Sequence, residues 1–509
     1  MQYRFLSLPL LALAGCLLAG CSKEDTTTDD AGSASSASAT ITGVFTSGSA
    51  EGSTETAYNE EDVPASNSFA DTVLITYGSS ITVTNPLEGK GVSVTVSGGD
   101  VTVAATVAGV AYQLQGSSLD GSLKLYSEKK FALVLNGLTL TNTDGPAINI
   151  QSKKRAFVVL AANTSNTLSD GASYTVTNAE EDQKGTLFSE GQLIFCGTGA
   201  LTVEGNYKHA ICSDDYIRVV EGSITISRAA TDGFHTNDAF ITDGGTISVT
   251  AASDGIECEE GFIVINDGSF VLNTGDDGIA ASYEGTDSGI VPYVVINGGS
   301  IEVNSTEGEG IESKNLLTIN NGNIKTITGD DGLNAGAGLF INGGRVYCRS
   351  TGNDAIDSNG KLTVTGGMVL AIAAGGPEAG FDCDANQFRV TGGLVVGIGG
   401  ATSAPTASVT TVPALIMGSG AANQLIHIRA ADGTEALTFE APVSYNTLLF
   451  AGSKLKQGTT YTIYTGGTIN DAASFFGLYT GGTYSGGKSG DSFTLSSIVT
   501  AIGGSVSRG

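Results

Sequence analysis

The sequence predicts an all-β protein built around a right-handed parallel β-helix, with about 23 residues and three strands in each turn. Three observations lead to this fold class: a recurring acidic motif, a glycine-led motif with the same spacing, and a composition that favours strands and turns. The chain of 509 residues has 72 glycines and no tryptophan, and its body is rich in Thr, Val and Ile. This composition argues against a helical protein.

The acidic motif is an Asp-Gly pair, or a close variant of it, followed by a large apolar residue. It begins at Asp232, Asp254, Asp277, Glu309, Asp331 and Asp354, in steps of 22, 23, 32, 22 and 23 residues. A fixed period of this length is typical of a solenoid. Strands separated by one period then pair with one another at a spacing of about 4.8 Å.

The glycine-led motif keeps step with the acidic one. It falls at Gly199, Gly222, Gly245, Gly268, Gly299, Gly322, Gly344 and Gly367. A single long step occurs at the same place in both series, and a loop from Tyr283 to Tyr293 accounts for it. Weaker turns begin near Val92, and an insertion is expected between Lys153 and Asp182. The coil is therefore expected to span residues 81–400.

The N-terminus predicts export and lipidation. Residues 1–20 read as a signal peptide, with an apolar run from Phe5 to Ala19 before Cys21. This segment resembles that of bacterial lipoproteins, which implies a lipid on Cys21, and the acids after it resemble the surface-export signal of Bacteroidota lipoproteins. Residues 21–40 read as a flexible tether and residues 41–80 as an irregular or β segment. The expected location is the outer membrane, with the protein exposed at the cell surface.

Charge and cysteine content exclude several classes of function. A net charge of −28 argues against binding to nucleic acid or anionic lipid, and it favours divalent cations. Five cysteines follow Cys21 without metal-ligand spacing, and we interpret them as small core residues of a monomeric protein. They are Cys196, Cys212, Cys258, Cys348 and Cys383.

Strand alternation assigns the faces of the acidic motif. One column is large and apolar and is expected to point inward: Phe234, Ile256, Ile279, Ile311, Leu333, Ile356 and Phe381. A second inward column is small: Thr236, Cys258, Ala281, Ser313, Ala335, Ser358 and Cys383. The residues between them are expected to face solvent and are often acidic, so one face should carry a ladder of carboxylates.

Stacked carboxylates repel one another, and Ca²⁺ offsets this repulsion because it accepts six to eight oxygen ligands in irregular geometry. The first candidate set is Asp232, Asp254, Glu257, Asp276 and Asp277, and the second is Glu309, Glu312, Asp330, Asp331, Asp354 and Asp357. The alternative is that the Asp-Gly pairs only make tight turns. His235, a histidine among acids, is expected to be a hydrogen-bonding surface residue.

Another outward face combines cations with an aromatic ring, as an anionic sugar requires. Its residues are Lys325, Arg345, Tyr347 and Arg349, and the alternative is a solvated edge. In the next turns the equivalent positions are apolar: Met368, Leu370, Leu394 and Val396. Water does not tolerate such a patch. The β-rich residues 401–509 are therefore expected to pack on the coil or to cap it.

The Asp-Gly-Ile turns, the corners from Ile296 to Ile301 and from Ile341 to Val346, and the segment from Leu138 to Ile148 resemble the family of carbohydrate-binding domain-containing β-helix proteins. The resemblance implies calcium sites and non-catalytic binding of cellulose and acidic plant polysaccharide. The sequence departs from an unbroken ladder at four positions, which leaves the number of ions open: Ala280, Ser282, Asn334 and Gly336.

Two other functions remain open from the sequence. A pectate-like polysaccharide lyase uses calcium and a basic residue on this fold, and Lys314 is the candidate base. A surface adhesin with a protein partner would use the loop from Tyr283 to Tyr293.

Overall fold

The computed structural model describes residues 39–40, 47–176 and 178–507. The predicted signal peptide and Cys21 lie outside these residues. The described part of the chain contains two 3-10 helices, η1 (Glu60–Asp62) and η2 (Pro64–Ser66). Among the described residues, no helix has the length and apolar character needed to cross a membrane.

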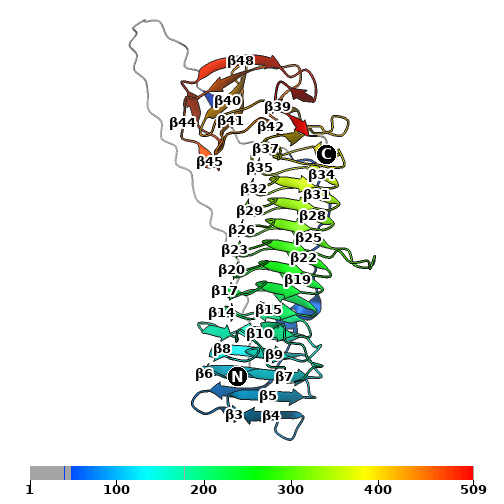
Figure 1. Ribbon diagram of the computed structural model, residues 1–509, viewed down its shortest axis with the longest axis vertical. Coiled ribbons are helices and arrows are strands. Elements are labelled where there is room, and N and C mark those ends of the chain that lie inside the picture. The colour runs from blue at the N-terminus through cyan, green and yellow to red at the C-terminus, as the bar shows by residue number, and fades with distance from the viewer. Residues whose placement is uncertain (1–38, 41–46, 177, 508–509) are drawn as a thin grey trace.

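Apart from these helices, the regular structure of the described residues is β, and most of it forms a parallel solenoid of about 13 turns with roughly 23 residues per turn. Figure 1 shows the turns stacked along the long axis of the molecule, with further sheets at the C-terminal end. The predicted β-helix with a β-rich C-terminal segment is confirmed.

Sheet 1 contains the short strands that follow the acidic motif, and neighbouring strands are parallel except for the antiparallel pair at its N-terminal end. Its strands are β4 (Val92–Ser97), β5 (Asp100–Ala105), β7 (Leu123–Ser127), β9 (Ile148–Ile150), β12 (Gly185–Ser189), β15 (His209–Ser213), β18 (Phe234–Thr236), β21 (Ile256–Cys258), β24 (Ile279–Ala281), β27 (Ile311–Ser313), β30 (Leu333–Ala335) and β33 (Ile356–Ser358).

Sheet 2 contains the next strand of each turn. It runs through β10 (Ala156–Leu160), β13 (Leu193–Cys196), β16 (Tyr216–Val219), β19 (Ala239–Thr242), β22 (Phe262–Ile265), β25 (Tyr293–Ile296), β28 (Leu316–Ile319), β31 (Gly338–Ile341), β34 (Lys361–Val364) and β36 (Phe388–Val390).

Sheet 3 contains the third strand and leads back to the acidic motif. It runs through β11 (Ser165–Ser169), β14 (Ala200–Gly205), β17 (Ser223–Ala229), β20 (Thr246–Ala251), β23 (Ser269–Thr274), β26 (Ser300–Ser305), β29 (Asn323–Thr328), β32 (Arg345–Ser350), β35 (Met368–Ile372) and β37 (Leu394–Gly399). At the N-terminal end the long strands β2 (Asp71–Tyr77), β6 (Val110–Ser118) and β8 (Phe131–Thr141) join sheets 2 and 3, and β3 (Thr82–Thr84) pairs antiparallel with β2.

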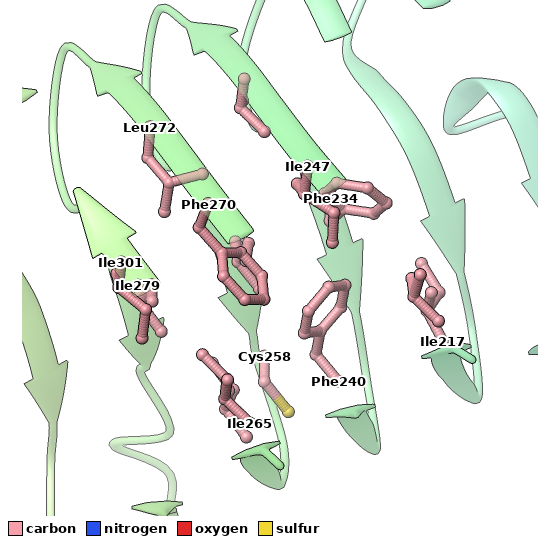
Figure 2. Close-up of a cluster of buried hydrophobic side chains, with 14 of the residues drawn as sticks. Ile217, Phe234, Phe240, Ile247, Cys258, Ile265, Phe270, Leu272, Ile279 and Ile301 are labelled. Carbon is pink, nitrogen blue, oxygen red and sulfur yellow. The ribbon is translucent and has the colours of Figure 1, made fainter. Parts of the chain in front are cut away.

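The two predicted inward columns lie in the interior of the coil together with apolar residues of the other two sheets, and every member of the columns is buried. Figure 2 shows Phe234, Phe240 and Phe270 pointing into this core beside Cys258. The five cysteines after Cys21 are free and buried, as predicted. Stacking of like side chains buries a continuous core that no single turn could bury alone.

The N-terminal half of the coil differs from the prediction in one respect. Strands β10 and β11 lie within the expected insertion between Lys153 and Asp182, and they pair with β8 as regular strands of the coil. The irregular insertion is shorter, and its described residues are 170–176 and 178–184. The polar residues around Asn163 interrupt the alternation of apolar and polar residues, so these two strands are not recognisable from the sequence.

The C-terminal segment packs on the end of the coil, as predicted. The apolar outward residues Met368, Leu370 and Val396 share one buried cluster with Ile428, Phe439 and other residues of this segment. Strand β42 (Thr447–Gly452) pairs antiparallel with β37 and with β39 (Ala414–Met417), which also pairs with β49 (Val499–Ala501). The remaining strands are β40 (Leu425–Ala430), β41 (Glu435–Glu440), β43 (Thr460–Thr465), β45 (Ala473–Phe475), β46 (Leu478–Thr480) and β48 (Lys488–Thr494) in one sheet, β1 (Ala39–Thr40), β44 (Thr468–Asn470) and β47 (Thr483–Ser485) in another, and the pair β38 (Thr402–Ser403) and β50 (Val506–Ser507).

Residues 47–62 form a strap along sheet 2 that ends in helix η1, and the sequence did not predict it. Side-chain amides from successive turns donate to its backbone carbonyls: Asn342 to Glu51, Asn320 to Ser53 and Asn297 to Glu55, at 2.6 to 2.8 Å. Each of these asparagines also donates to an asparagine one turn back. The strap thereby covers one outward face of the coil.

Candidate functional site

The acidic motif lies at the corner where sheet 3 turns into sheet 1. There, one carboxylate oxygen of an acid accepts a hydrogen bond from the backbone N–H of its equivalent one turn on. Asp254 Oδ1 accepts from Asp277 at 2.9 Å, and Asp277 Oδ1 accepts from Glu309 at 2.8 Å. Asp331 Oδ1 accepts from Asp354 at 3.0 Å. The Asp-Gly pairs therefore do make turns, but this duty occupies only one of their oxygens.

The acids are more buried than the sequence indicated. Strand alternation placed Glu312 and Asp357 in a solvent-facing column, yet they are 4% and 9% exposed. Asp232, Asp254, Asp277 and Asp331 are also buried, whereas Glu309 and Asp354 are half-buried. The reason is that each side chain is flanked by its counterparts one turn above and below. The expectation of an exposed carboxylate ladder was wrong. Its side chains are largely shielded from solvent.

The first predicted set is brought together by the fold. Ligand atoms of Asp232, Asp254 and Glu257 lie within 4.8 Å of one another, and so do those of Asp254, Asp276 and Asp277. Burial, together with the charges of Asp232 and Glu257, raises the pKa of Asp254 to about 8. Burial and the adjacent Glu309 raise the pKa of Asp277 to about 10. Negative charge is therefore poorly compensated here.

Glycine at position 308 allows these carboxylates to pack closely against the turn. A Cβ atom at Gly308 would lie 2.4 Å from Asp276 Oδ1 and 2.5 Å from Asp277 Oδ1. Any other residue at this position would displace both oxygens. A donor set made only of carboxylate oxygens suits Ca²⁺ better than a softer metal. The residues present therefore fit calcium.

The second predicted set is only partly assembled. Asp354 and Asp357 join Asp382, with ligand atoms within 4.8 Å. Asp357 Oδ1 is buried and has no hydrogen-bond partner in the described structure, so its charge also lacks compensation. Burial and the neighbouring Asp354 and Asp382 raise the pKa of Asp357 to about 7. Sequence reasoning left out Asp382 because its turn begins with Gly380-Phe381 instead of an Asp-Gly pair.

The other members of that set have different partners. Within the described residues, Glu309, Glu312, Asp330 and Asp331 belong to no group of three ligands. Glu312 pairs with Lys314, and Asp330 accepts from Asn353 at 2.6 Å. A further acidic group that the sequence did not single out contains Asp182, Glu190 and Asp214, and Lys184 lies 2.7 Å from Asp214 in its midst.

The histidine in the ladder is not a surface residue. His235 is 9% exposed, and its Nδ1 lies 3.1 Å from Asp232 and 3.0 Å from Glu257. Burial opposes its protonation, but these two carboxylates outweigh burial and raise the pKa of His235 to about 10. Its ring stacks on that of His209 at 4.0 Å, a residue that sequence reasoning missed. His209 stands 23 residues before Asp232, so extending the period by one step would have found it.

The predicted basic face is covered at its aromatic residue, whereas Arg345 is exposed. Tyr347 is 5% exposed and stacks on Phe476 of the C-terminal segment at 3.9 Å, so its ring is not free for a sugar. Arg345 lies over the Phe475 ring, and Lys325 pairs with Glu302 at 2.6 Å. Arg349 is half-buried. The prediction of an exposed aromatic among cations was wrong, because the capping segment occupies that face.

The candidate base is held as a cation. Lys314 Nζ lies 2.7 Å from Glu312 and 3.3 Å from Glu284. Partial burial opposes its charge, but the two carboxylates outweigh burial and raise the pKa of Lys314 above its ordinary value. The deprotonated form that a proton-abstracting base requires is therefore disfavoured at Lys314.

Comparison with known proteins gives three matches. A solved structure of a polysaccharide lyase-like protein from C. thermocellum, a gadolinium derivative, is 24% identical with a TM-score of 0.42 and covers 53% of this chain and 96% of its own. A carbohydrate-binding domain-containing protein of Acetivibrio thermocellus is 29% identical over 118 residues, which is 23% of this chain and 41% of that protein. The chain thus spans less than half the length of this relative.

The third match is to a family model, which aligns with residues 97–379 and 293–432. Together these stretches include most of the coil, the whole acidic face and the start of the C-terminal segment, and they exceed half of the chain. The chain therefore belongs to the family of carbohydrate-binding domain-containing proteins.

Proposed function

We propose that the protein binds an acidic polysaccharide by means of Ca²⁺ held on its acidic face, and that it does not cleave the chain it binds. Membership of the family supports a carbohydrate ligand. The observation that carries the calcium dependence is the buried, unpartnered Oδ1 of Asp357 beside Asp354 and Asp382. A buried carboxylate oxygen without a hydrogen bond is unfavourable unless a cation lies against it.

The charge of the protein explains why an ion would be needed. With a net charge of −28, direct contact between its carboxylates and those of a uronate would be repulsive. Bound Ca²⁺ would supply a positive centre with ligand positions left for a sugar carboxylate. The groups that would hold it are Asp254, Asp276 and Asp277 in one place and Asp354, Asp357 and Asp382 in another. The two groups lie on different turns of the coil, so a linear polymer lying along this face could contact both.

Absence of catalysis is proposed because Lys314 is tied to Glu312 and Glu284. We also propose that Cys21 carries a lipid that anchors the protein to the outer membrane at the cell surface. This anchor would place the coil where it can meet extracellular polysaccharide. Loss of membrane association in Cys21→Ser would test it.

The decisive experiment measures retention on immobilised polygalacturonate in EDTA, in Ca²⁺ and in Mg²⁺. Binding is expected in Ca²⁺, to be lost in EDTA and to be restored poorly by Mg²⁺, which sheds its waters reluctantly. Asp357→Asn should weaken binding, whereas Asp384→Asn, which removes a nearby exposed charge, should not. Binding that persists in EDTA would refute the role of calcium. Unsaturated, ultraviolet-absorbing products that disappear in Lys314→Ala would show a lyase instead.

A further inference from the structure

At the N-terminal side of the calcium candidates, consecutive turns bring His209 and His235 together around Asp232, and Glu257 lies beside His235. His209 lies on β15, His235 on β18 and Glu257 on β21, while Asp232 precedes β18. The ligand atoms of His209, Asp232 and His235 lie within 4.8 Å of one another, and all three residues are buried. This is a different donor chemistry from the all-oxygen groups farther along the ladder.

The two imidazoles converge on a single carboxylate oxygen. Asp232 Oδ2 lies 2.8 Å from Nδ1 of His209 and 3.1 Å from Nδ1 of His235. Nδ1 of His235 is also 3.0 Å from Glu257 Oε2, so one nitrogen faces two acids. Neighbouring ligand atoms of a tetrahedral zinc site are separated by about 3.3 Å, as follows from bonds of about 2.0 Å. The observed separations come close to this without any rearrangement of the backbone.

The outer nitrogen of His235 provides a second, independent observation. Its Nε2 lies 3.4 Å from Glu259 Oε2, on the side of the ring away from Asp232. Metal-binding histidines usually donate their other N–H to a carboxylate, which fixes the tautomer that leaves the first nitrogen free to bind. In His235, Nε2 lies near the Glu259 carboxylate and Nδ1 faces the shared oxygen of Asp232, so a carboxylate stands on the side where such a partner is needed.

We propose that His209, Asp232 and His235, with Glu257 as fourth ligand, form a binding site for a transition-metal ion of the zinc class. Imidazole nitrogen selects such ions over Ca²⁺, which prefers oxygen. On binding, the ion replaces the proton at Nδ1 of each imidazole that carries one, this proton passes to solvent, and the ion separates the two rings from the shared oxygen. The site joins three turns of the coil. It also assigns Asp232 to this centre, so the neighbouring calcium group consists of Asp254, Asp276 and Asp277.

The experiment uses the fact that the chain has only three histidines. The third, His427, is buried in the C-terminal sheet, where it bonds Thr438 and stacks on Tyr484. In protein labelled with ¹⁵N-histidine, one equivalent of Zn²⁺ should shift the imidazole signals of two residues and leave the third unchanged. This readout requires no variant. Signals that do not move, or that move for all three residues, would overturn the site.

Calorimetry of Zn²⁺ binding then identifies the ligands. His209→Gln and His235→Gln should each weaken binding by more than about 100-fold, beyond the ~10–100-fold that loss of an outer partner costs. The control Thr231→Val removes a hydroxyl 3.0 Å from His209 Nδ1 but no ligand, and it should bind Zn²⁺ as the parent does. Excess Ca²⁺ should not compete. Full Zn²⁺ affinity in the double glutamine variant, or displacement of Zn²⁺ by Ca²⁺, would show that the histidines only hydrogen-bond the acids.

Discussion

Replacing Asp357 by Asn should have opposite effects on stability with and without calcium. Ligand atoms of Asp357, Asp354 and Asp382 lie within 4.8 Å of one another, and Asp357 Oδ1 has no hydrogen-bond partner among the residues that the structure describes. Two unit charges at this distance repel by about 3 kcal/mol at an effective dielectric constant of ~20. Partial protonation lowers this value, because the pKa of Asp357 is already raised to about 7. The variant should therefore be more stable than the parent in EDTA, by about 1–2 kcal/mol near pH 7.5.

In calcium the order should reverse. An ion present at about 100 times its dissociation constant stabilises the parent by about 2.7 kcal/mol, and the variant, which lacks one carboxylate ligand, should gain much less. The assay is thermal unfolding, followed by circular dichroism, in EDTA and over a calcium titration. Asp384→Asn is the matched control, since it removes an exposed charge two residues beyond Asp382 and should keep the full calcium response. If Asp357→Asn were destabilised equally in both buffers, the carboxylate would have only a structural role, such as accepting from Asn359.

Three other predictions concern the scaffold. Ile256→Asp places a charge in the centre of the coil, where Ile256 is fully buried, and should cost on the order of 5 kcal/mol in a denaturant titration; an unchanged midpoint would contradict the burial. Asp62→Ala removes a buried carboxylate 2.7 Å from Arg155 Nε and 3.4 Å from Arg218, and should cost about 3 kcal/mol and make the strap more susceptible to limited proteolysis. Burial lowers the pKa of His427 to about 4, so the neutral ring contributes stability above pH 6.5 that is lost as pH falls from 6.5 towards 4; His427→Gln should flatten the dependence of the melting temperature on pH in that range.

The fold could be predicted from the sequence because the same spacing of residues recurs in every turn. Ile256, Ile279 and Ile311 stand at equivalent positions, and only an inward direction for all of them gives a continuous core. Alternation then determines the direction of their neighbours. The same reasoning located the capping segment, since Leu370 and Val396 continue an outward column with apolar residues that need a cover.

The environment of the site was less accessible, because it depends on contacts between segments far apart in the chain. Alternation gives the direction of a side chain but not what lies over it, so Tyr347 was predicted exposed although Phe476 covers it. Similarly, Asn320 and Asn342 could be recognised as corner residues, but their partners in the strap lie more than 260 positions earlier in the sequence. No local pattern identifies such a partner.

The ladder shows how a repeat can vary its ligand chemistry without changing its backbone. His209, Asp232, Asp254 and Asp277 occupy the same place in four successive turns, at intervals of 23, 22 and 23 residues. The corner fixes the direction of the side chain. A substitution in this column therefore changes the type of donor atom but keeps it one turn away from the next donor. Nitrogen donors at the N-terminal end and oxygen donors beyond Asp254 would therefore give two classes of metal site along one face. If both are filled, removal of zinc should leave calcium-dependent retention on polygalacturonate intact.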